Sequence, residues 1–324
     1  MESAYSILYL VALGVVTILT LLRHRIMIYT FWPVVLFYPY AWFRSHTPFF
    51  LLGMHDIYIL LCGLLILLDF RRLREGFARC EATIAGFILL LGFQTLVHFW
   101  AAALYLSDDP QESWLVPIRI LTSDLRCFVP GLLVVAYVRD ERETRKAVFW
   151  FVLSVIGAFG LVIADRFGSF VFNVFNHTAY QSSIALSHYR SVGGFGGPWE
   201  VGAVGAAAIV FVLYLLVMRG YLNQLLGAAA IASAGVGIAF SLSRSGIMAA
   251  ATGAVAVLVL SGFRARLQAL VIIALTFVAL SNLRFEDARQ TYDLANLVEN
   301  RMTTAYKGGE FADTAESRVS IWNR

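Results

Sequence analysis

The chain has 324 residues, of which 59% are hydrophobic and 14% are charged, and it carries a formal net charge of +4 at pH 7. Its mean hydropathy is +0.73. Because soluble domains carry nearer about a quarter charged residues, this composition excludes an ordinary soluble domain and predicts an integral membrane protein. Cys62, Cys80 and Cys127 show no metal-binding or redox spacing and are interpreted as packing residues. No cofactor, metal or nucleic-acid partner is expected.

Ten apolar segments are long enough to cross a membrane, since a helix needs about 20 mostly apolar residues to span the hydrocarbon core. They lie near residues 5–22, 26–43, 49–69, 82–104, 118–138, 147–164, 199–217, 222–240, 246–262 and 267–282. The predicted fold is therefore an all-α polytopic membrane protein with about ten transmembrane helices. We expect residues 1–282 to form the helical bundle and the polar stretch 283–324 to begin a large loop domain outside the cytoplasm.

The loops between these segments are alternately rich and poor in basic residues. The rich loops hold Arg23 and Arg25; Arg71, Arg72, Arg74 and Arg79; Arg139, Arg142, Arg145 and Lys146; Arg219; and Arg264 and Arg266. Because short cytoplasmic loops carry the excess of basic residues, the rich set is predicted to be cytoplasmic. Residue 1, the loop 165–197, Arg244 and the tail are then predicted to face outward.

One long apolar region must contain a turn. From Leu222 to Leu260, at about 1.5 Å per residue, the chain exceeds a hydrocarbon core of about 30 Å nearly twofold. Its only polar interruption near the middle is Ser241-Leu-Ser-Arg-Ser-Gly246, so the chain is predicted to turn there. Arg244 then lies at a tight outer turn, and Arg190 lies on the same face, shortly before a helix predicted to begin at Pro198.

Both of these helix starts have the composition of a phosphate site. Gly197 before Pro198 lets backbone amides approach a ligand, and a helix N-terminus presents free N–H groups and a partial positive charge. The same arrangement recurs at Ser243, Ser245 and Gly246. An arginine beside each helix start adds a planar, charged guanidinium group whose N–H groups match phosphate oxygens. Two surface turns with an interfacial arginine at each would have the same sequence, so both interpretations stay open.

The fifth segment, 118–138, carries Asp124 and Arg126 inside its apolar run. A charge near the middle of the bilayer costs about 2.5–3.5 kcal/mol on insertion scales, so such residues usually face a cavity or a partner. Asp124 and Arg126 are secondary candidates for the substrate site, and a charged pair that locks two helices together is the alternative. His98, alone on an apolar helix, is interpreted as a packing histidine.

The loop 165–197 is expected to carry a short amphipathic helix. Its apolar residues recur at helical spacing from Phe167 to Phe175, with polar residues between them. Such a helix would lie in the outer membrane interface beside a lipid-linked substrate, or would pack as a loop helix on the bundle.

Three motifs lie in order on the predicted outer face: Arg190-x-x-Gly-x-Phe-Gly-x-Pro198, Ser243-Arg-Ser-Gly246 and Glu316-Ser-Arg-x-x-x-Trp322. Together they resemble the O-antigen ligase and O-antigen polymerase family of bacterial membrane glycosyltransferases. The resemblance covers about residues 150–324, and the first five segments match only as apolar helices.

The resemblance implies a multi-pass enzyme of the bacterial inner membrane that acts at its periplasmic face on glycans linked to undecaprenyl diphosphate. It implies transfer of the glycan to an acceptor hydroxyl on the lipid A core, on another repeat unit, or on another saccharide or lipid. Arg190 and Arg244 would hold the diphosphate, and Arg318 matches an arginine of the family's large periplasmic loop. Fixed guanidinium and backbone donors stabilise a leaving diphosphate without a metal.

The sequence departs from the family in one respect. The family's large loop continues past the Arg-x-x-x-Trp motif to a histidine thought to act as the base, whereas no histidine lies between Leu283 and Arg324. The catalytic histidine is therefore expected beyond Arg324 in a longer chain, or else the acceptor is activated differently.

Two other functions fit the same composition. A transporter or flippase of a lipid-linked or anionic solute could use the arginines without chemistry, although the paired repeats and broken helices typical of transporters are not evident. A different lipid-donor glycosyltransferase could hold a metal at Asp108 and Asp109 in an acidic outer loop.

Overall fold

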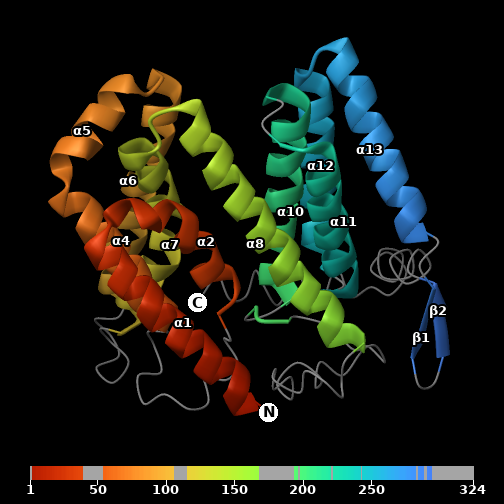
Figure 1. The fold of residues 1–324 in the computed structure, drawn as a ribbon, viewed down its shortest axis with the longest axis horizontal. Helices are drawn as coiled ribbons and strands as arrows, with labels where there is room; N and C mark the ends of the chain where they lie inside the picture. Colours follow the sequence, from red (N-terminus) through yellow and green to blue (C-terminus); the bar gives the residue numbers. More distant parts are fainter. Residues whose placement is uncertain are drawn as a thin grey trace. The chain divides into compact units, whose positions relative to one another are not determined.

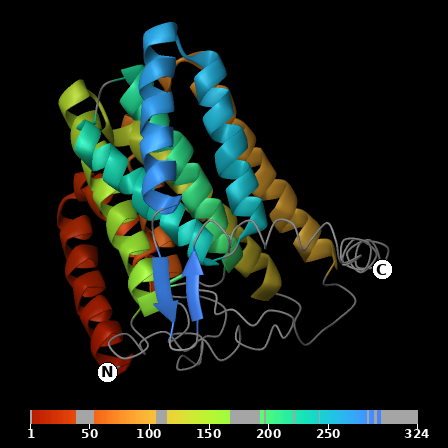
Figure 2. The ribbon, with the colours of Figure 1, turned by 90° about the vertical axis from the view of Figure 1, so that its right-hand side faces the viewer.

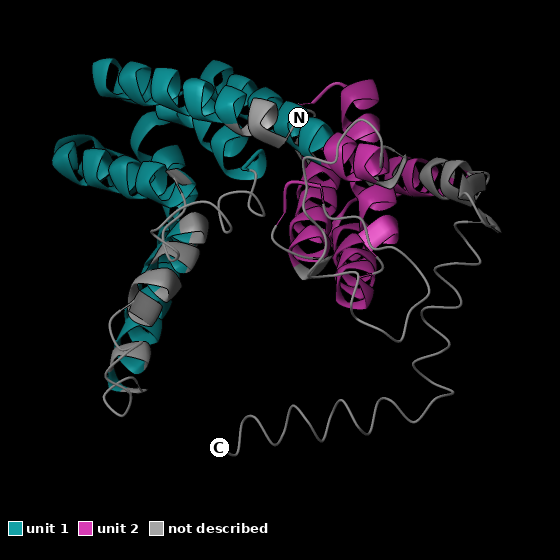
Figure 3. Ribbon diagram, turned by 90° about the horizontal axis from the view of Figure 1, so that it is seen from below, with its two compact units in different colours: residues 1–158, 168–177 teal, residues 159–167, 178–324 magenta. Residues whose placement is uncertain are grey.

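The computed structural model of the chain describes residues 2–38, 54–105, 115–167, 193–195, 198–219, 222–241, 243–281, 284–287 and 290–293. Their regular structure is helical except for one two-stranded hairpin (Figure 1). These residues belong to two compact units (Figure 3). Unit 1 holds the described residues up to Ala158, and unit 2 holds those from Phe159 onward.

The described part of unit 1 is built from helices. They are α1 (Glu2–Leu22), α2 (Met27–Leu36), α4 (Met54–Leu68), α5 (Phe70–Arg79), α6 (Ala82–Tyr105), α7 (Leu115–Tyr137) and the first part of α8 (Glu141–Phe167). A 3-10 turn over His24–Ile26 joins α1 to α2. Each of the first six predicted apolar segments overlaps one of these helices, whereas α5 is an additional helix in a region predicted only as an arginine-rich loop.

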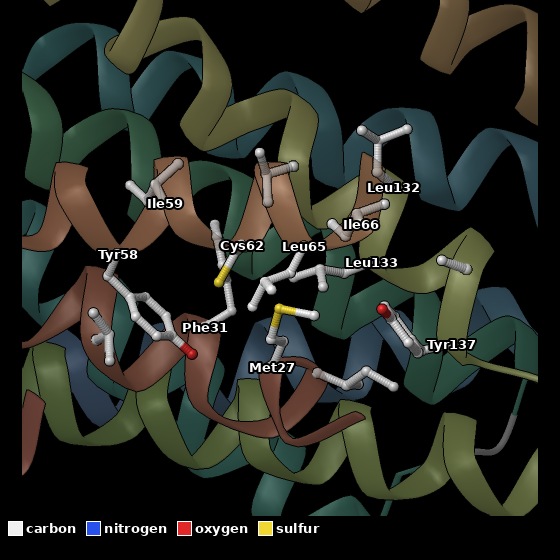
Figure 4. Packing of buried hydrophobic residues seen from close by; sticks show 14 of the residues in the cluster. Met27, Phe31, Tyr58, Ile59, Cys62, Leu65, Ile66, Leu132, Leu133 and Tyr137 are labelled. Carbon is white, nitrogen blue, oxygen red and sulfur yellow. The ribbon is translucent and has the colours of Figure 1, made fainter. Parts of the chain in front are cut away.

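The core of unit 1 forms around α4 (Figure 4). Tyr58, Cys62 and Leu65 recur at helical spacing and are buried. The hydroxyl of Tyr58 lies 3.1 Å from the hydroxyl of Thr20 and 2.8 Å from that of Thr30, so this buried polar group has hydrogen-bond partners. The helices α2 and α7 contribute Met27, Phe31, Leu132, Leu133 and Tyr137 to the same cluster.

The helix α2 is shorter than the sequence predicts. The segment 26–43 is expected to cross the membrane, but the ten residues of α2 are only about 15 Å long at about 1.5 Å per residue. Phe37 leaves the helical conformation, with φ −96° and ψ 9°, two residues before Pro39. A residue before proline is disfavoured in the helical region, which explains an early end. Residues 39–43 lie outside the described part, so a crossing by this segment stays a prediction.

The three arginine-rich loops of unit 1 meet at one end of the unit. Arg25 Nη1 lies 3.4 Å from Glu143 Oε1, which joins the α1–α2 turn to the start of α8. Arg139 Nη2 lies 3.5 Å from Glu75 Oε2, which joins the α7–α8 turn to α5. Loops that the sequence predicts to share one membrane face are thus brought together.

The described part of unit 2 contains the end of α8, four further helices and a hairpin. The elements are α10 (Pro198–Tyr214), continued by the π-helical turn Leu215–Arg219, then α11 (Gln224–Ser241), α12 (Arg244–Leu260), α13 (Phe263–Ser281), β1 (Arg284–Asp287) and β2 (Gln290–Asp293). Phe159 of α8 is fully buried among them. Its ring lies where a side chain at Gly205 of α10 or Gly237 of α11 would be, so these helices close directly on it.

The hairpin is the one departure from an all-helical fold in the described part of the chain. It follows the end of α13 (Figure 2). The two strands pair antiparallel, with Phe285 opposite Tyr292 and Glu286 opposite Thr291. Phe, Tyr and Thr favour strands, and the apolar run that forms α13 has ended before them.

Four helices of the described part are long and apolar enough to cross a membrane. They contain the stretches Ile84–Ala101, Glu141–Asp165, Glu200–Val217 and Gln224–Ser241. Shorter apolar stretches lie at Ile7–Leu22, His55–Leu68, Phe128–Tyr137 and Arg244–Leu260. The chain therefore has helices of the kind that cross a membrane, while the number of ten crossings stays a prediction.

Candidate functional site

The helices α10 and α12 lie side by side and begin at the same end of unit 2. A Cβ built at Gly246 would meet the backbone of Gly202, and one built at Gly253 would meet the side chain of Val210. Since both contacts advance in the same direction along the two helices, the helices run parallel. Their free N–H groups and the positive ends of both helix dipoles are therefore adjacent.

Ser243 caps the start of α12. Its backbone is extended, with φ −82° and ψ 99°, and its Oγ accepts a 3.3 Å hydrogen bond from the backbone N–H of Gly246. The Ser243 side chain is buried, with its Oγ where a side chain at Gly202 of α10 would be. Ser245 is exposed, and its hydroxyl lies 3.4 Å from that of Ser243. Ser243 is thus occupied in forming the helix start, whereas Ser245 keeps a hydroxyl at the surface beside it.

Arg244 is the first residue of α12, and its side chain is partly buried. Its Nε atom is buried and has no hydrogen-bond acceptor within the described part of the chain. A buried donor without an acceptor costs about 1–3 kcal/mol, and a cation at a helix N-terminus is further disfavoured by the positive end of the helix dipole. An anion bound beside Arg244 would remove both costs.

The turn Gly193–Phe195 is attached to the end of α8. The backbone N–H of Gly193 donates a 3.1 Å hydrogen bond to Oδ2 of Asp165, which is buried. Gly193 has φ +54°, and a Cβ there would lie 2.8 Å from the backbone nitrogen of Val162, so only glycine fits. The contact fixes the chain three residues after Arg190. Asp165 is not among the predicted site residues, although a carboxylate near the end of an apolar helix signals a specific partner.

Several predicted site residues lie outside the described residues. They are Arg190, Gly197, Arg318 and the side chain of Arg126, together with Asp108, Asp109 and the proposed amphipathic helix from residue 168 onward. The structure brings Ser243, Arg244, Ser245 and Gly246 together at one helix start. A site shared by Arg190 and Arg244 stays a prediction.

The secondary candidate Asp124 has a partner in unit 1 that the sequence did not indicate. Its Oδ2 lies 2.8 Å from Nδ1 of His98, which links α7 to α6. The side chains are 25% and 46% exposed, respectively, so the pair lies at the surface of the two helices. This bond fits the interpretation of Asp124 as a charge that joins two helices, with His98 rather than an arginine as its described partner.

Comparison with known proteins identifies no relative of this chain. No family model, curated protein or solved structure matches this chain.

Proposed function

We propose that this protein transfers a glycan from an undecaprenyl-diphosphate carrier to an acceptor hydroxyl at the periplasmic face of the bacterial inner membrane. The observation that supports this most directly is the buried Nε of Arg244, which has no acceptor among the described residues and lies where α10 and α12 begin side by side. A diphosphate would accept hydrogen bonds from this guanidinium and from the N–H groups of the adjacent helix starts.

The proposed reaction needs stabilisation of a leaving diphosphate. The bond between the anomeric carbon and the diphosphate oxygen breaks, and its electron pair stays on the diphosphate. The acceptor oxygen forms the new bond to the carbon and loses its proton to a base. Donors that are fixed in place before the reaction stabilise the departing charge most effectively. Arg244, Ser245 and the helix starts would supply such donors, and by resemblance Arg190 and Arg318 would add two guanidiniums.

The proposed orientation in the membrane rests on the basic residues. In unit 1 the arginine-rich loops meet at one end. In unit 2 Arg219 ends the turn that continues α10, and Arg266 lies in the first turn of α13, so both lie at the end opposite to Arg244. If the basic ends are cytoplasmic, the start of α12 faces the periplasm, where the resemblance implies that the substrate is used.

The test of this proposal is binding of the carrier headgroup to the purified chain. Native mass spectrometry in detergent would compare undecaprenyl diphosphate with undecaprenol, which has the same chain and no charge. We expect the wild-type chain to prefer the diphosphate. Arg244→Ala should weaken this binding about tenfold or more, since a hydrogen bond to a charged group contributes about 1.5–3 kcal/mol. Arg219→Ala, at the opposite end of α10, is the matched control and should bind as the wild type does.

Equal binding of the diphosphate and the alcohol, or normal binding by Arg244→Ala, would contradict the proposal. A second measurement separates transfer from transport. When the chain is incubated with a glycan linked to undecaprenyl diphosphate and an acceptor, transfer releases free undecaprenyl diphosphate. A transporter or flippase would bind the carrier and leave its glycan attached.

A further inference from the structure

The ten-residue helix α5 in unit 1 has two distinct faces. On one face Leu73 and Gly76 are buried. A Cβ built at Gly76 would meet the backbone oxygen of Val135, so this face is packed directly on α7. Asp69 immediately precedes α5. Its Oδ2 accepts a 3.4 Å hydrogen bond from the hydroxyl of Tyr137, the last residue of α7. The helix is therefore fixed in position on α7, and its opposite face is turned away from the core.

The outward face of α5 is basic. Arg71, Arg74 and Arg79 are all exposed, and the side chain of Arg71 is 91% exposed. Glu75 is the only acidic residue of the helix, and it is shared by Arg71 at 3.2 Å and Arg139 at 3.5 Å. Within the described part of the chain Arg74 has no ion-pair partner. The face therefore keeps a positive charge that the protein itself does not neutralise.

The surrounding loops add to this charge. Residues 23–25, 69–81 and 139–146 carry ten arginine or lysine side chains against six acidic ones, a net charge of +4. The ion pairs Arg25–Glu143 and Arg139–Glu75 hold these segments at the same end of unit 1. The basic face of α5 is thus part of a wider positive end.

Exposed apolar side chains lie immediately before the basic face of α5 along the chain. Leu64, Leu67 and Leu68 on the last turns of α4 are 54%, 59% and 72% exposed, respectively. Phe70, the first residue of α5, is 63% exposed. Apolar side chains that remain exposed on a membrane helix face lipid acyl chains, and Phe70 is the last exposed apolar side chain before Arg71. The arginines that follow Phe70 are then at the level of the phosphates.

We propose that the outward face of α5, formed by Arg71, Arg74 and Arg79 with Phe70 at its edge, binds the headgroups of anionic phospholipids. Guanidinium groups pair with phosphate oxygens through two parallel hydrogen bonds, and each basic residue near an anionic membrane surface strengthens attraction to it. The exposed leucines of α4 would contact the acyl chains of the same lipids. This assignment concerns unit 1 and does not depend on the proposed glycan transfer.

The test uses the full chain purified in detergent and two lipids with identical acyl chains, phosphatidylglycerol and phosphatidylcholine. Binding is measured by native mass spectrometry. We expect the wild-type chain to prefer phosphatidylglycerol. The triple variant Arg71→Gln/Arg74→Gln/Arg79→Gln should lose affinity by about fivefold for each arginine removed. The triple variant with lysine at the same positions keeps the three charges but loses the paired hydrogen bonds of the guanidiniums, so it should retain more of the preference than the glutamine variant. It also shows whether the helix tolerates substitution.

The matched control removes the same number of charges from the same end of unit 1, through Arg142→Gln/Arg145→Gln/Lys146→Gln. These side chains are exposed on the first turns of α8. We expect this variant to lose much less affinity than the α5 variant. Equal losses from both triple variants would mean a diffuse charge effect and would overturn the assignment to α5. Absence of any preference for phosphatidylglycerol, or competition by soluble glycerol phosphate at equal concentration, would overturn the assignment to a lipid.

Discussion

Asp165 and Gly193 are 28 positions apart in the sequence and are joined by a buried hydrogen bond of 3.1 Å, in which the backbone N–H of Gly193 donates to the carboxylate. The bond lies within unit 2, between the last turn of α8 and the turn Gly193–Phe195. Because α10 begins five residues after Gly193, this bond helps to set where the helix start lies relative to α8. It therefore supports the candidate diphosphate site without belonging to it.

Removal of this bond should destabilise the protein. In Asp165→Ala the N–H of Gly193 would stay buried without its acceptor, at a cost of about 1–3 kcal/mol. Thermal unfolding in detergent should show a midpoint lower by roughly 1–2 °C for each kcal/mol. Asp165→Asn keeps an acceptor oxygen and should retain most of the stability. An alanine variant that unfolds at the wild-type temperature would show that the bond contributes nothing.

Substitutions of the two serines at the start of α12 should have different effects, one on stability and the other on binding. Ser243→Ala removes the helix cap and should lower the free energy of unfolding by about 1 kcal/mol. Ser245→Ala removes an exposed hydroxyl and should change stability by less than about 0.5 kcal/mol. The same change should weaken binding of undecaprenyl diphosphate severalfold. Thermal unfolding and native mass spectrometry measure the two effects, and an unstable Ser245→Ala beside a stable Ser243→Ala would reverse the assigned roles.

The close contact of α10 and α12 should not tolerate a methyl group. In Gly246→Ala the new side chain would meet the backbone of Gly202, which cannot move aside as a side chain can. Overpacking of this kind costs about 1–3 kcal/mol, and diphosphate binding should fall because the helix starts are forced apart. The control is Gly160→Ala in α8, where nothing lies near the added Cβ. It should be neutral or stabilising by up to about 1 kcal/mol, and a similar loss in both variants would argue against the contact.

A positive charge at position 244 should not by itself be sufficient for diphosphate binding. Arg244→Lys keeps the positive charge and loses the planar fork that bonds two phosphate oxygens at once, so we expect diphosphate binding about tenfold weaker. Expression and membrane insertion should be unchanged, because the side chain of Arg244 is only partly buried at a helix start. Binding would be measured beside Arg219→Lys as the control. Wild-type affinity in Arg244→Lys would show that the fork geometry has no role.

The orientation can be tested by labelling single cysteines in a variant without Cys62, Cys80 and Cys127. Ser245→Cys should react with an impermeant maleimide in intact spheroplasts, because the start of α12 is proposed to face the periplasm. Arg142→Cys should react only after the membrane is made permeable, because the arginine-rich loops are proposed to be cytoplasmic. The opposite pattern would place the helix starts in the cytoplasm and remove them from the proposed substrate.

The positions of most helices could be predicted from the order of residues along the chain. A membrane helix bonds its own backbone, so an uninterrupted apolar run is enough to specify it. The turn predicted at Ser241–Gly246 separates α11 from α12, and α10 begins at Pro198 as predicted. Proline at a first helical position and serine at a cap act within three or four residues, which is why these boundaries could be predicted.

Contacts between distant residues required the tertiary structure. Nothing near Gly202 or Gly246 in the sequence indicates that their backbones touch, because close approach depends on how two helices cross. The partners of Asp165 and Asp124 could likewise not be predicted from the sequence. A carboxylate in an apolar helix predicts that a partner exists but not which residue it is. The apolar and basic residues of α5 were visible in the sequence, yet a short amphipathic helix is stable only through packing. The contact of Gly76 with α7 supplies that packing and decides which face of α5 is turned outward.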